Sequence, residues 1–490
     1  MSDTTERMSP PGRPKGEYPR AQPEGTPLSR VDHAWLRMDN DVNLMMIVGV
    51  WLLQPAVGYD ALCRRIEQRL LQYPRFRQKV VEDLLGATWE EDADFDLRRH
   101  VVRERLPKRR GQSERQALQA LCGKLAMTPL DAAHPLWQFH LVEHYEGGSA
   151  ILVRIHHCIG DGISLTSVVL SITDGGEAPP RHGDDHDRDA HEDWLADTVI
   201  RPLTDMAVRA IDLSAEGVLR SMDLMSHPQA RTRELARVGA RVATDLAALA
   251  LMDDDSPTRL KGRPAGRKVV AWGEPLPLDV VKSVGKALGA SVNDVLLSCV
   301  AGAIGDYLRG IGDDPSGKAI RAMVPVNLRP LHQVHELGNR FGLAPLLLPI
   351  GIDNPIERVF AVRRRMSELK GSYQPVLAFG VLAVAGLLNK SSQDALLNLF
   401  ARKATAVMTN VPGPPRLLSF CGSTLRQSIF WVPQTGDVAV GVSIFSYGGG
   451  VQFALISDRR LCPQPQQVID RFAPELDKLV WLTLMLPWAA

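Results

Sequence analysis

The chain has 490 residues, which is too long for one ordinary hydrophobic core and suits two domains. Hydrophobic residues make up 45% and charged residues 23%, as in a globular protein, and the net charge of +1 gives no electrostatic argument for nucleic acid binding. The six cysteines are scattered without paired spacing, which indicates a reduced, cytoplasmic setting.

The first 28 residues are polar and rich in Pro and Gly, so we expect a disordered tail without the apolar core of a secretory signal. No run reaches the ~20 apolar residues that a membrane-spanning helix needs. The longest apolar runs, 44–53, 343–350 and 376–388, are expected to fill a core. A peripheral membrane contact is the less favoured interpretation for 376–388.

In the first part of the chain, apolar residues recur at strand spacing or at helix spacing between turn signals. These patterns predict strands over 44–53, 88–95, 138–145 and 150–156, and helices over 59–72, 113–127 and 163–171. The strands 138–145 and 150–156 are expected to form a hairpin through Gly147-Gly148.

Residues 174–195 are rich in Gly, Pro and charged side chains, which predicts a solvated linker. Two amphipathic helices, about 203–225 and 233–251, follow. The patterns beyond them predict strands over 269–272, 322–326, 346–350, 438–445 and 451–456, and helices over 279–288, 295–304 and 466–481. The sequence therefore predicts an α/β (α+β) protein with a tail (1–28), a lobe (29–174), a crossover (175–265) and a second lobe (266–490).

The stretch from His156 to Gly162 is the strongest chemical signal in the chain. The apolar residues 151–153 lead into His156-His157, and Asp161-Gly162 follows four residues after the second histidine. A strand ending in a Gly-bearing loop fits this pattern and can hold one imidazole in a cleft. Because imidazole titrates near ~6.5, it can accept a proton from a hydroxyl or amine at neutral pH.

Two other interpretations of this stretch remain open. A His-His pair is more often a surface or satisfied core feature than a catalytic one. His156, His157 and Asp161 are also metal-ligand types, but adjacent residues on a strand point to opposite faces. No Cys-x-x-Cys, His-Glu-x-x-His or carboxylate cluster supports a metal, so we predict none.

The His156-His157-x-x-x-Asp161-Gly162 motif resembles the active-site signature of the CoA-dependent acyltransferase superfamily. From about Leu28 to about Phe472 the chain also resembles the bacterial wax ester synthase/diacylglycerol acyltransferase family. The motifs that carry this resemblance occur in the family's order: Pro129-Leu130-Asp131, Pro135-Leu136-Trp137, Asn293-Asp294-Val295, Pro325-Val326-Asn327-Leu328-Arg329, Gly338-Asn339-Arg340-Phe341 and Asn410-Val411-Pro412-Gly413-Pro414.

The resemblance implies two similar mixed-sheet lobes joined by a long crossover, with the active site in a tunnel between them. It implies transfer of an acyl group from long-chain acyl-CoA, a substrate and not a cofactor, to diacylglycerol or a fatty alcohol, giving triacylglycerol or wax ester. It also implies peripheral contact with the inner face of the plasma membrane or with lipid inclusions. The chain departs from the family at Asn43-Leu44-Met45-Met46, where many members carry Pro-Met-His. That departure bears on substrate preference and not on the reaction.

By match to the family's second histidine, His157 is the expected general base, and His156 is expected to point away and shape the loop. Asp161 either orients the histidine directly or, as the resemblance implies, pairs with Arg329 and holds the loop. Gly162 is expected to supply a backbone conformation that a Cβ would oppose.

The remaining expectations concern the substrate path. Asn293 either stabilises the oxyanion from a helix start or shares a plain capping role with Ser291. Pro135-Leu136-Trp137 either line the alcohol channel or form a rigid turn with a core Trp. Asp294 and Asn410 are expected among the substrate-binding residues, with a turn as the alternative for 410–414. The seven Lys and Arg residues between Arg98 and Arg110 fit either CoA phosphates or lipid, or a solvated face.

Two alternatives to the acyl-CoA enzyme follow from the same motifs. One is a stand-alone condensation-type domain that uses carrier-protein thioesters. The other is a non-enzymatic lipid-body protein with an inactive transferase fold. The intact His157 and Asp161 argue against the second alternative.

Overall fold

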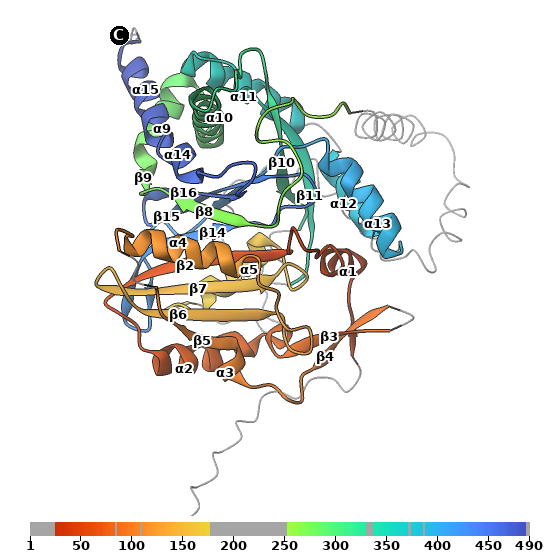
Figure 1. Cartoon of the computed structure of the whole chain (residues 1–490). Coiled ribbons are helices and arrows are strands. Elements are labelled where there is room, and N and C mark those ends of the chain that lie inside the picture. Colours follow the sequence, from red (N-terminus) through yellow and green to blue (C-terminus); the bar gives the residue numbers. More distant parts are fainter. Residues whose placement is uncertain are drawn as a thin grey trace, which may run out of the picture.

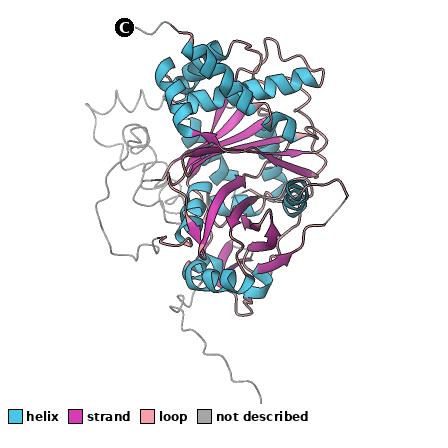
Figure 2. Cartoon of the chain, turned by 90° about the vertical axis from the view of Figure 1, so that its left-hand side faces the viewer, coloured by secondary structure: helices cyan, strands magenta, loops and turns pink. Residues whose placement is uncertain are grey.

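The protein is described by a computed structural model that covers residues 25–83, 86–107, 110–176, 252–329, 337–370, 374–385 and 388–486 (Figure 1). The predicted tail lies almost wholly outside these residues, and so do the predicted linker and helices between 177 and 251. Two large mixed sheets dominate the described part, and Figure 2 shows them one above the other, with helices on the outer face of the upper sheet.

The first large sheet has the strand order β13-β14-β2-β7-β6-β5. The predicted hairpin is confirmed, because β6 and β7 pair antiparallel across a turn in which Glu146 and Gly147 have positive φ. The apolar run at 44–53 is also confirmed as a strand, β2, and it pairs antiparallel with β7. The bounds of the six strands are β13 (Ser419–Phe420), β14 (Ser423–Trp431), β2 (Met46–Gln54), β7 (Gly148–His156), β6 (Trp137–Tyr145) and β5 (Val101–Glu104).

Helices and a small sheet surround this first sheet. The predicted helix 59–72 is an α-helix only to Arg69 and continues as a 3-10 turn, Leu70–Gln72. Ser113 and Gln116 form a capping box that starts the predicted helix at 113–127. The bounds are α1 (Arg30–Leu36), α2 (Tyr59–Arg69), α3 (Leu97–His100), α4 (Glu114–Leu125) and α5 (Gly162–Ser171), with the small sheet β1 (Thr26–Pro27), β4 (Ala87–Glu91) and β3 (Gln78–Glu82).

The second large sheet has the order β11-β10-β12-β15-β16-β8, with β9 also paired to β16. Its central strands β10, β12 and β15 run parallel to one another. The predicted strands 438–445 and 451–456 are confirmed as β15 and β16, which pair antiparallel as a hairpin. The bounds are β8 (Lys268–Trp272), β9 (Leu276–Pro277), β10 (Ile320–Asn327), β11 (Phe341–Leu348), β12 (Ala406–Pro412), β15 (Val440–Tyr447) and β16 (Gly450–Asp458).

The helices of the second half cover that sheet. Ser291 caps α10 and forms a capping box with Asp294. The predicted helix 466–481 is two helices, α14 and α15, that meet at Asp470 and Arg471. The bounds are α9 (Leu278–Leu288), α10 (Val292–Gly310), α11 (Pro355–Lys370), α12 (Gln374–Ala385), α13 (Lys390–Ala401), α14 (Pro465–Ile469) and α15 (Phe472–Leu484).

One segment of the second half belongs to the first sheet. Strand β14 pairs antiparallel with β2, with Ile429 opposite Val50 and Trp431 opposite Val48. A second lobe made only of residues 266–490 is therefore not what the structure shows, since 419–431 complete the sheet of the first lobe. Local sequence patterns do not reveal this arrangement, because they show that a strand forms and not which strand it pairs with.

A shared hydrophobic core holds the two sheets together. Val48 and Val50 of β2, Trp431 of β14 and Trp272 of β8 are buried in one cluster. The rings of Trp272 and Trp431 lie 5.8 Å apart. Because β14 lies in one sheet and packs on β15 and β16 of the other, the lobes form a continuous unit around their seam.

Helix α12 contains most of the apolar stretch at 376–388, and it packs against other elements of the protein. Helix α12 lies on β11 and beside α1, and its Phe379 and Leu382 are each 5% exposed. Among the described residues, no single helix combines the length and apolar character needed to cross a membrane; α9 and α10 reach them only together, with a 101° bend between them.

Candidate active site at the seam of the lobes

The two histidines lie where β7 ends beside the start of β2. The backbone N–H of His156 donates to the carbonyl of Leu136 at 2.9 Å, and the N–H of His157 donates to the carbonyl of Met45 at 2.7 Å. The strand β7 ends at His156, and the chain then turns through a loop into α5. This change of direction sends the two neighbouring imidazoles into different surroundings.

The imidazole of His157 is held between aromatic rings. It is stacked on Trp35 of α1, with ring centroids 4.2 Å apart and an interplanar angle of 13°, and Phe341 of β11 lies at 5.6 Å. The residue is 5% exposed. Burial lowers the pKa of His157 to about 4, because a charged imidazolium loses its hydration in this setting. The ring is therefore neutral at physiological pH and able to accept a proton.

His157 lines a cavity of about 120 Å³ between the lobes. Trp35, Met45 and Ile163 contribute from the first half of the chain, and strands β10, β11 and β12 contribute from the second. The polar groups in this mainly apolar lining are His157, Asp161, Asn327, Thr409, Asn410, Gln434 and Thr435. The Thr409 hydroxyl is buried and has no hydrogen-bond partner among the described residues.

Asp161 locks the loop and does not hydrogen-bond to the imidazole of His157. Its carboxylate caps α5 by accepting from the Ser164 N–H at 2.9 Å, and it also accepts from the Arg340 N–H at 3.2 Å. The expected ion pair with Arg329 is present at 3.1 Å, and both side chains are nearly fully buried. The carboxylate thus joins the histidine loop to the second half of the chain, and the arrangement is not a Ser-His-Asp type of relay.

The backbone around Gly338 reinforces this junction. Asp161 N–H donates to the Gly338 carbonyl at 3.3 Å, and Gly338 N–H donates to the Ile159 carbonyl at 3.1 Å. Arg329 also donates to the Gly338 carbonyl, at 2.7 Å. The loop that carries His157 is therefore fixed by main-chain bonds to the segment just before β11.

Asp32 and Asn339 make a third connection between the first half of the chain and the segment before β11. Neither residue was in the predicted site. The Asn339 N–H and side-chain amide donate to Asp32 Oδ1 at 3.0 and 2.7 Å. The same amide donates to the His157 carbonyl at 2.6 Å. Burial raises the pKa of Asp32 to about 6. Asp32 and Trp35 lie one helical turn apart on α1, and this i, i+3 spacing is their only signal in the sequence.

His156 faces a different cavity. Its Nδ1 accepts from the Cys158 N–H at 3.1 Å, and its Nε2 lies 3.3 Å from Asp39 Oδ1. This cavity, about 290 Å³, is also lined by Leu130 and Leu136. His156 therefore shapes the start of the loop and does not share the cavity of His157.

The Pro135-Leu136-Trp137 motif divides between two roles. Leu136 borders the His156 cavity, and its carbonyl fixes the His156 backbone. Trp137 is fully buried in the first lobe, donates its Nε1–H to the Phe76 carbonyl at 2.9 Å and stacks on His100 at 4.4 Å. The prediction that Trp137 lines an alcohol channel is wrong, because the ring completes the core beneath the sheet.

The Asn293-Asp294 pair lies at the start of α10. Asp294 is 6% exposed, and its carboxylate accepts from the Ser291 N–H at 2.9 Å, so it serves the capping box and not a substrate. Asn293 is exposed and accepts a hydrogen bond of 2.5 Å from the Asn410 amide. Of the three predicted residues only Asn410 lines the His157 cavity. Ser291 and Asp294 therefore cap this helix, and the side chain of Asn293 pairs with Asn410.

The expectation for Gly162 is wrong in its physical reason. Gly162 is the first residue of α5 and is not among the glycines with positive φ. A Cβ built on it would meet nothing within 4 Å. What the glycine provides is space, since it borders the His157 cavity and a second, apolar cavity.

The basic run between Arg98 and Arg110 lies away from the His157 cavity where it is described. Arg99 hydrogen-bonds to His134, and Arg103 lies 4.2 Å from the centroid of the Tyr59 ring; neither borders the cavity of His157. Lys108 and Arg109 lie outside the described residues. Within the described ranges, no group of three or more His, Cys, Asp or Glu side chains is placed to hold a metal ion.

Two solved structures share this architecture. The wax ester synthase/diacylglycerol acyltransferase from Marinobacter aquaeolei VT8 matches with a TM-score of 0.63 and 22% identity, covering 94% of this chain and all of that one. The first condensation domain of the CDA synthetase matches with a TM-score of 0.57 and 16% identity, covering 95% of this chain and 97% of that one. The two-lobed fold is therefore that of the CoA-dependent acyltransferases.

Sequence comparison narrows the class to one family. The wax ester synthase/diacylglycerol acyltransferase catalytic domain matches residues 28–296, and the WS/DGAT C-terminal domain matches residues 337–480. The chain belongs to the wax ester synthase/diacylglycerol acyltransferase family and is an acyltransferase. It is 25% identical over 448 residues to the probable diacylglycerol O-acyltransferase tgs1 of Mycobacterium tuberculosis, covering 88% of this chain and 90% of that protein.

Proposed function

We propose that the protein transfers a long-chain acyl group from acyl-CoA to the hydroxyl of diacylglycerol or a fatty alcohol, with His157 as general base. The observation that carries the proposal is a neutral imidazole, buried between Trp35 and Phe341, that lines the cavity between the lobes. Family membership and the names of the relatives support the substrate class.

The chemistry requires one base that works twice. His157 takes the proton of the acceptor hydroxyl while the oxygen attacks the thioester carbonyl. The tetrahedral intermediate then collapses, the carbon–sulfur bond breaks, and His157 returns the proton to the departing thiolate. The products are the ester and free CoA. A well-placed base typically contributes ~10²–10⁴ in rate.

Thr409 is the best-placed group for the negative charge that develops on the carbonyl oxygen. Thr409 lines the same cavity as His157, and its hydroxyl is buried without a hydrogen-bond partner among the described residues. A donor that is already oriented in a dry site stabilises an oxyanion more than water does. In our proposal this hydroxyl stabilises the oxyanion, which is one of the two roles that the sequence had suggested for Asn293.

The experiment is thiol release from palmitoyl-CoA by the purified protein, with hexadecanol and separately with dipalmitoylglycerol. We expect release that depends on an acceptor and that falls by ~10²-fold or more in His157→Ala. His156→Ala is the matched control, because it removes the neighbouring imidazole that faces the other cavity. The ratio of the two acceptors ranks wax ester against triacylglycerol synthesis.

The same assay tests the alternatives. Acceptor-dependent release that survives in His157→Ala would remove the base from the mechanism. A folded wild type that gives no release from acyl-CoA, but turns over when the same acyl group is presented on a carrier protein, would favour the condensation-type activity. A folded protein that is inactive with both donors would favour a non-enzymatic role.

We also propose that the protein works at the inner face of the plasma membrane or at lipid inclusions, where its acceptors are found. Trp481, Leu484 and Met485 are 64%, 59% and 76% exposed at the end of α15. Their i, i+3, i+4 spacing places them on one helix face, and Trp suits a membrane interface because its ring is apolar with one polar group. Flotation with liposomes tests this: we expect a joint Trp481→Ser and Leu484→Ser variant to lose binding while keeping its melting temperature, and unchanged flotation would contradict the assignment.

A further inference from the structure

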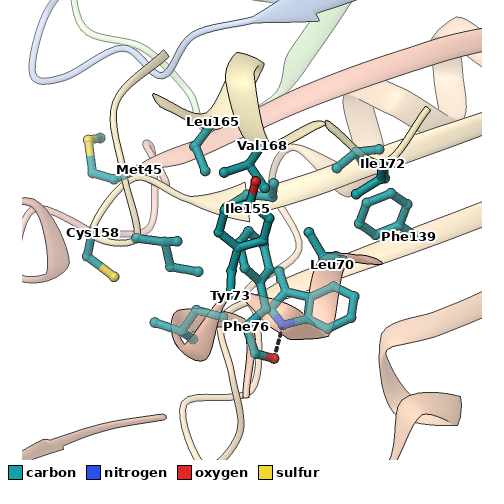
Figure 3. Close-up of a cluster of buried hydrophobic side chains, with 14 of the residues drawn as sticks. Met45, Leu70, Tyr73, Phe76, Phe139, Ile155, Cys158, Leu165, Val168 and Ile172 are labelled. Atoms are coloured by element: carbon teal, nitrogen blue, oxygen red, sulfur yellow. Dashed lines mark hydrogen bonds between the residues drawn. The ribbon is translucent and has the colours of Figure 1, made fainter. Parts of the chain in front are cut away.

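Helix α5 leaves open space above the sheet that it covers. Leu165 and Val168 of this helix and Ile172, its C-cap, are buried, and Figure 3 shows them in one cluster with Tyr73 and Phe139. Leu165 also borders a cavity of about 70 Å³, together with Gly162, Thr166, Val169 and Leu170. These five positions follow helical spacing along one side of α5.

The floor of this cavity is one face of the first sheet. Ile47, Gly49 and Trp51 alternate along β2, so all three point to the same side, while Val48 and Val50 point into the core between the lobes. The neighbouring strands add side chains next to them in register: Val153 and Ile155 from β7, and Ser428 and Phe430 from β14. The lining is apolar apart from the hydroxyls of Thr166 and Ser428.

Two glycines keep the space open, one on each side. A Cβ on Gly162 would meet nothing within 4 Å, and a Cβ on Gly49 would find its nearest atoms at 3.5 and 4.0 Å, which is ordinary contact. Protein interiors normally fill such gaps with side chains, because an unfilled cavity costs stability. A helix that leaves the gap open over a strand with a matching glycine is suited to an apolar guest.

The cavity leads away from the catalytic histidine. It shares Gly162, Phe430 and Val432 with the cavity of His157, so the two meet at the start of α5. Ile47 is opposite Ile155, one residue before the histidine pair, and Trp51 is opposite Ile151, four residues further from it. From Ile47 to Trp51 the strand covers ~13 Å, and from Gly162 to Leu170 the helix covers ~12 Å. The two walls therefore run together from the site to Trp51.

We propose that the space between α5 and β2 is the binding site for the fatty acyl chain of the donor, entered at Gly162 and closed at Trp51. This placement rests on the proposed acyl transfer, and it assigns the acyl chain of the donor and the acceptor to separate cavities. An acyl chain is a single chain without polar groups, which fits this narrow lining. Diacylglycerol carries two chains and ester carbonyls, and it fits better in the larger His157 cavity, whose lining includes the polar side chains of Thr409 and Asn410.

Gly49→Val tests the assignment by filling the cavity from the strand side. We measure kcat/KM for butyryl-CoA and palmitoyl-CoA with hexadecanol as a fixed acceptor. We expect the palmitoyl-CoA value to fall by about tenfold or more, and the butyryl-CoA value to change by no more than about twofold. Val169→Phe, which fills the same cavity from α5, is expected to act alike, so a folding defect in one variant does not leave the question open.

Gly58→Val is the matched control, because it adds the same side chain as Gly49→Val. A Cβ on Gly58 would meet nothing within 4 Å, and Gly58 borders neither cavity. An equal loss with both donors in Gly49→Val and Val169→Phe would overturn the acyl site. So would a change in the hexadecanol-to-butanol ratio with butyryl-CoA as fixed donor, because the cavity would then hold the acceptor. A wild type without acceptor-dependent turnover would instead contradict the proposed function itself.

Discussion

The ring of Trp35 is stacked on the ring of His157, with centroids 4.2 Å apart and planes inclined by 13°. The contact joins α1, near the start of the described chain, to a loop more than a hundred residues away. A buried imidazole that acts as a base must keep both its orientation and its neutrality. The indole face is an apolar wall that fixes the orientation of the imidazole. It also excludes water, which keeps the imidazole neutral.

We expect Trp35→Ala to lower kcat by ~10-fold to ~10²-fold, because a small displacement of a catalytic group is costly in rate. Trp35→Phe should retain most of the activity, since a planar ring remains. Steady-state kinetics with palmitoyl-CoA measure both variants, and melting temperatures separate a folding defect from a catalytic one. Equal activity of the alanine and phenylalanine variants would argue against a positioning role.

The pKa of about 4 for His157 predicts the pH dependence of the reaction. The value of kcat/KM should stay level from about pH 8 to about pH 6.5 and should fall as the pH drops through about 4, because the protonated imidazole cannot act as a base. Asp32, with a pKa of about 6, is expected to add a smaller step near that pH, which Asp32→Asn should abolish. If most of the activity were lost near pH 6.5, the imidazole would have its ordinary pKa, which would mean that water reaches it.

The lowered pKa of His157 also makes the stability of the protein depend on pH. The folded pKa of His157, about 4, lies below its ordinary value of 6.5, so between these values the unfolded chain binds more protons. The stability of the wild type relative to His157→Gln should therefore decrease as the pH falls through that window. Asp32 acts in the opposite direction between about 6 and 3.8, and it is common to both proteins. Urea unfolding of the two proteins at a series of pH values measures the difference.

Removing the carboxylate of Asp161 should cost more stability than removing an exposed one. Asp161→Ala takes away the partner of a buried guanidinium and the cap of α5, and losses of ~3–5 kcal/mol are typical for one side of a buried pair. Asp279, 95% exposed beside Lys282, is the comparison, and its alanine variant should unfold almost like the wild type. If urea unfolding gave similar curves for both variants, the ion pair with Arg329 would not hold the loop.

Thr409→Val tests the oxyanion donor with little change of shape. We expect kcat to fall by ~10²-fold, the size seen when one such donor is lost, while stability stays equal or increases because a buried hydroxyl without a described partner is removed. Thr409→Ser keeps the hydroxyl and should keep most of the rate. A valine variant with wild-type kcat would exclude this hydroxyl from the transition state.

The sequence predicted the parts of the site that lie in one short stretch. His157 and Asp161 could be recognised because the loop that carries them is continuous, and Arg329 followed from the family motif. Trp35 and Asp32 could not, because only the folded chain brings α1 against that loop. Asn293 was misassigned because a helix start offers both a cap and an anion site, and the sequence does not say which one faces the cavity. Gly162 was misread because a glycine needed for empty space looks the same in a sequence as one needed for an unusual φ.

The placement of β14 has a consequence for engineering and evolution of the protein. If the chain were cut in the crossover and the first piece produced alone, β2 would become an edge strand with free N–H and C=O groups and an uncovered apolar face. The second piece would carry β13 and β14 as a hairpin without the rest of their sheet. Each fragment should therefore aggregate on its own, and co-expression should restore a soluble complex through complementation between the two pieces.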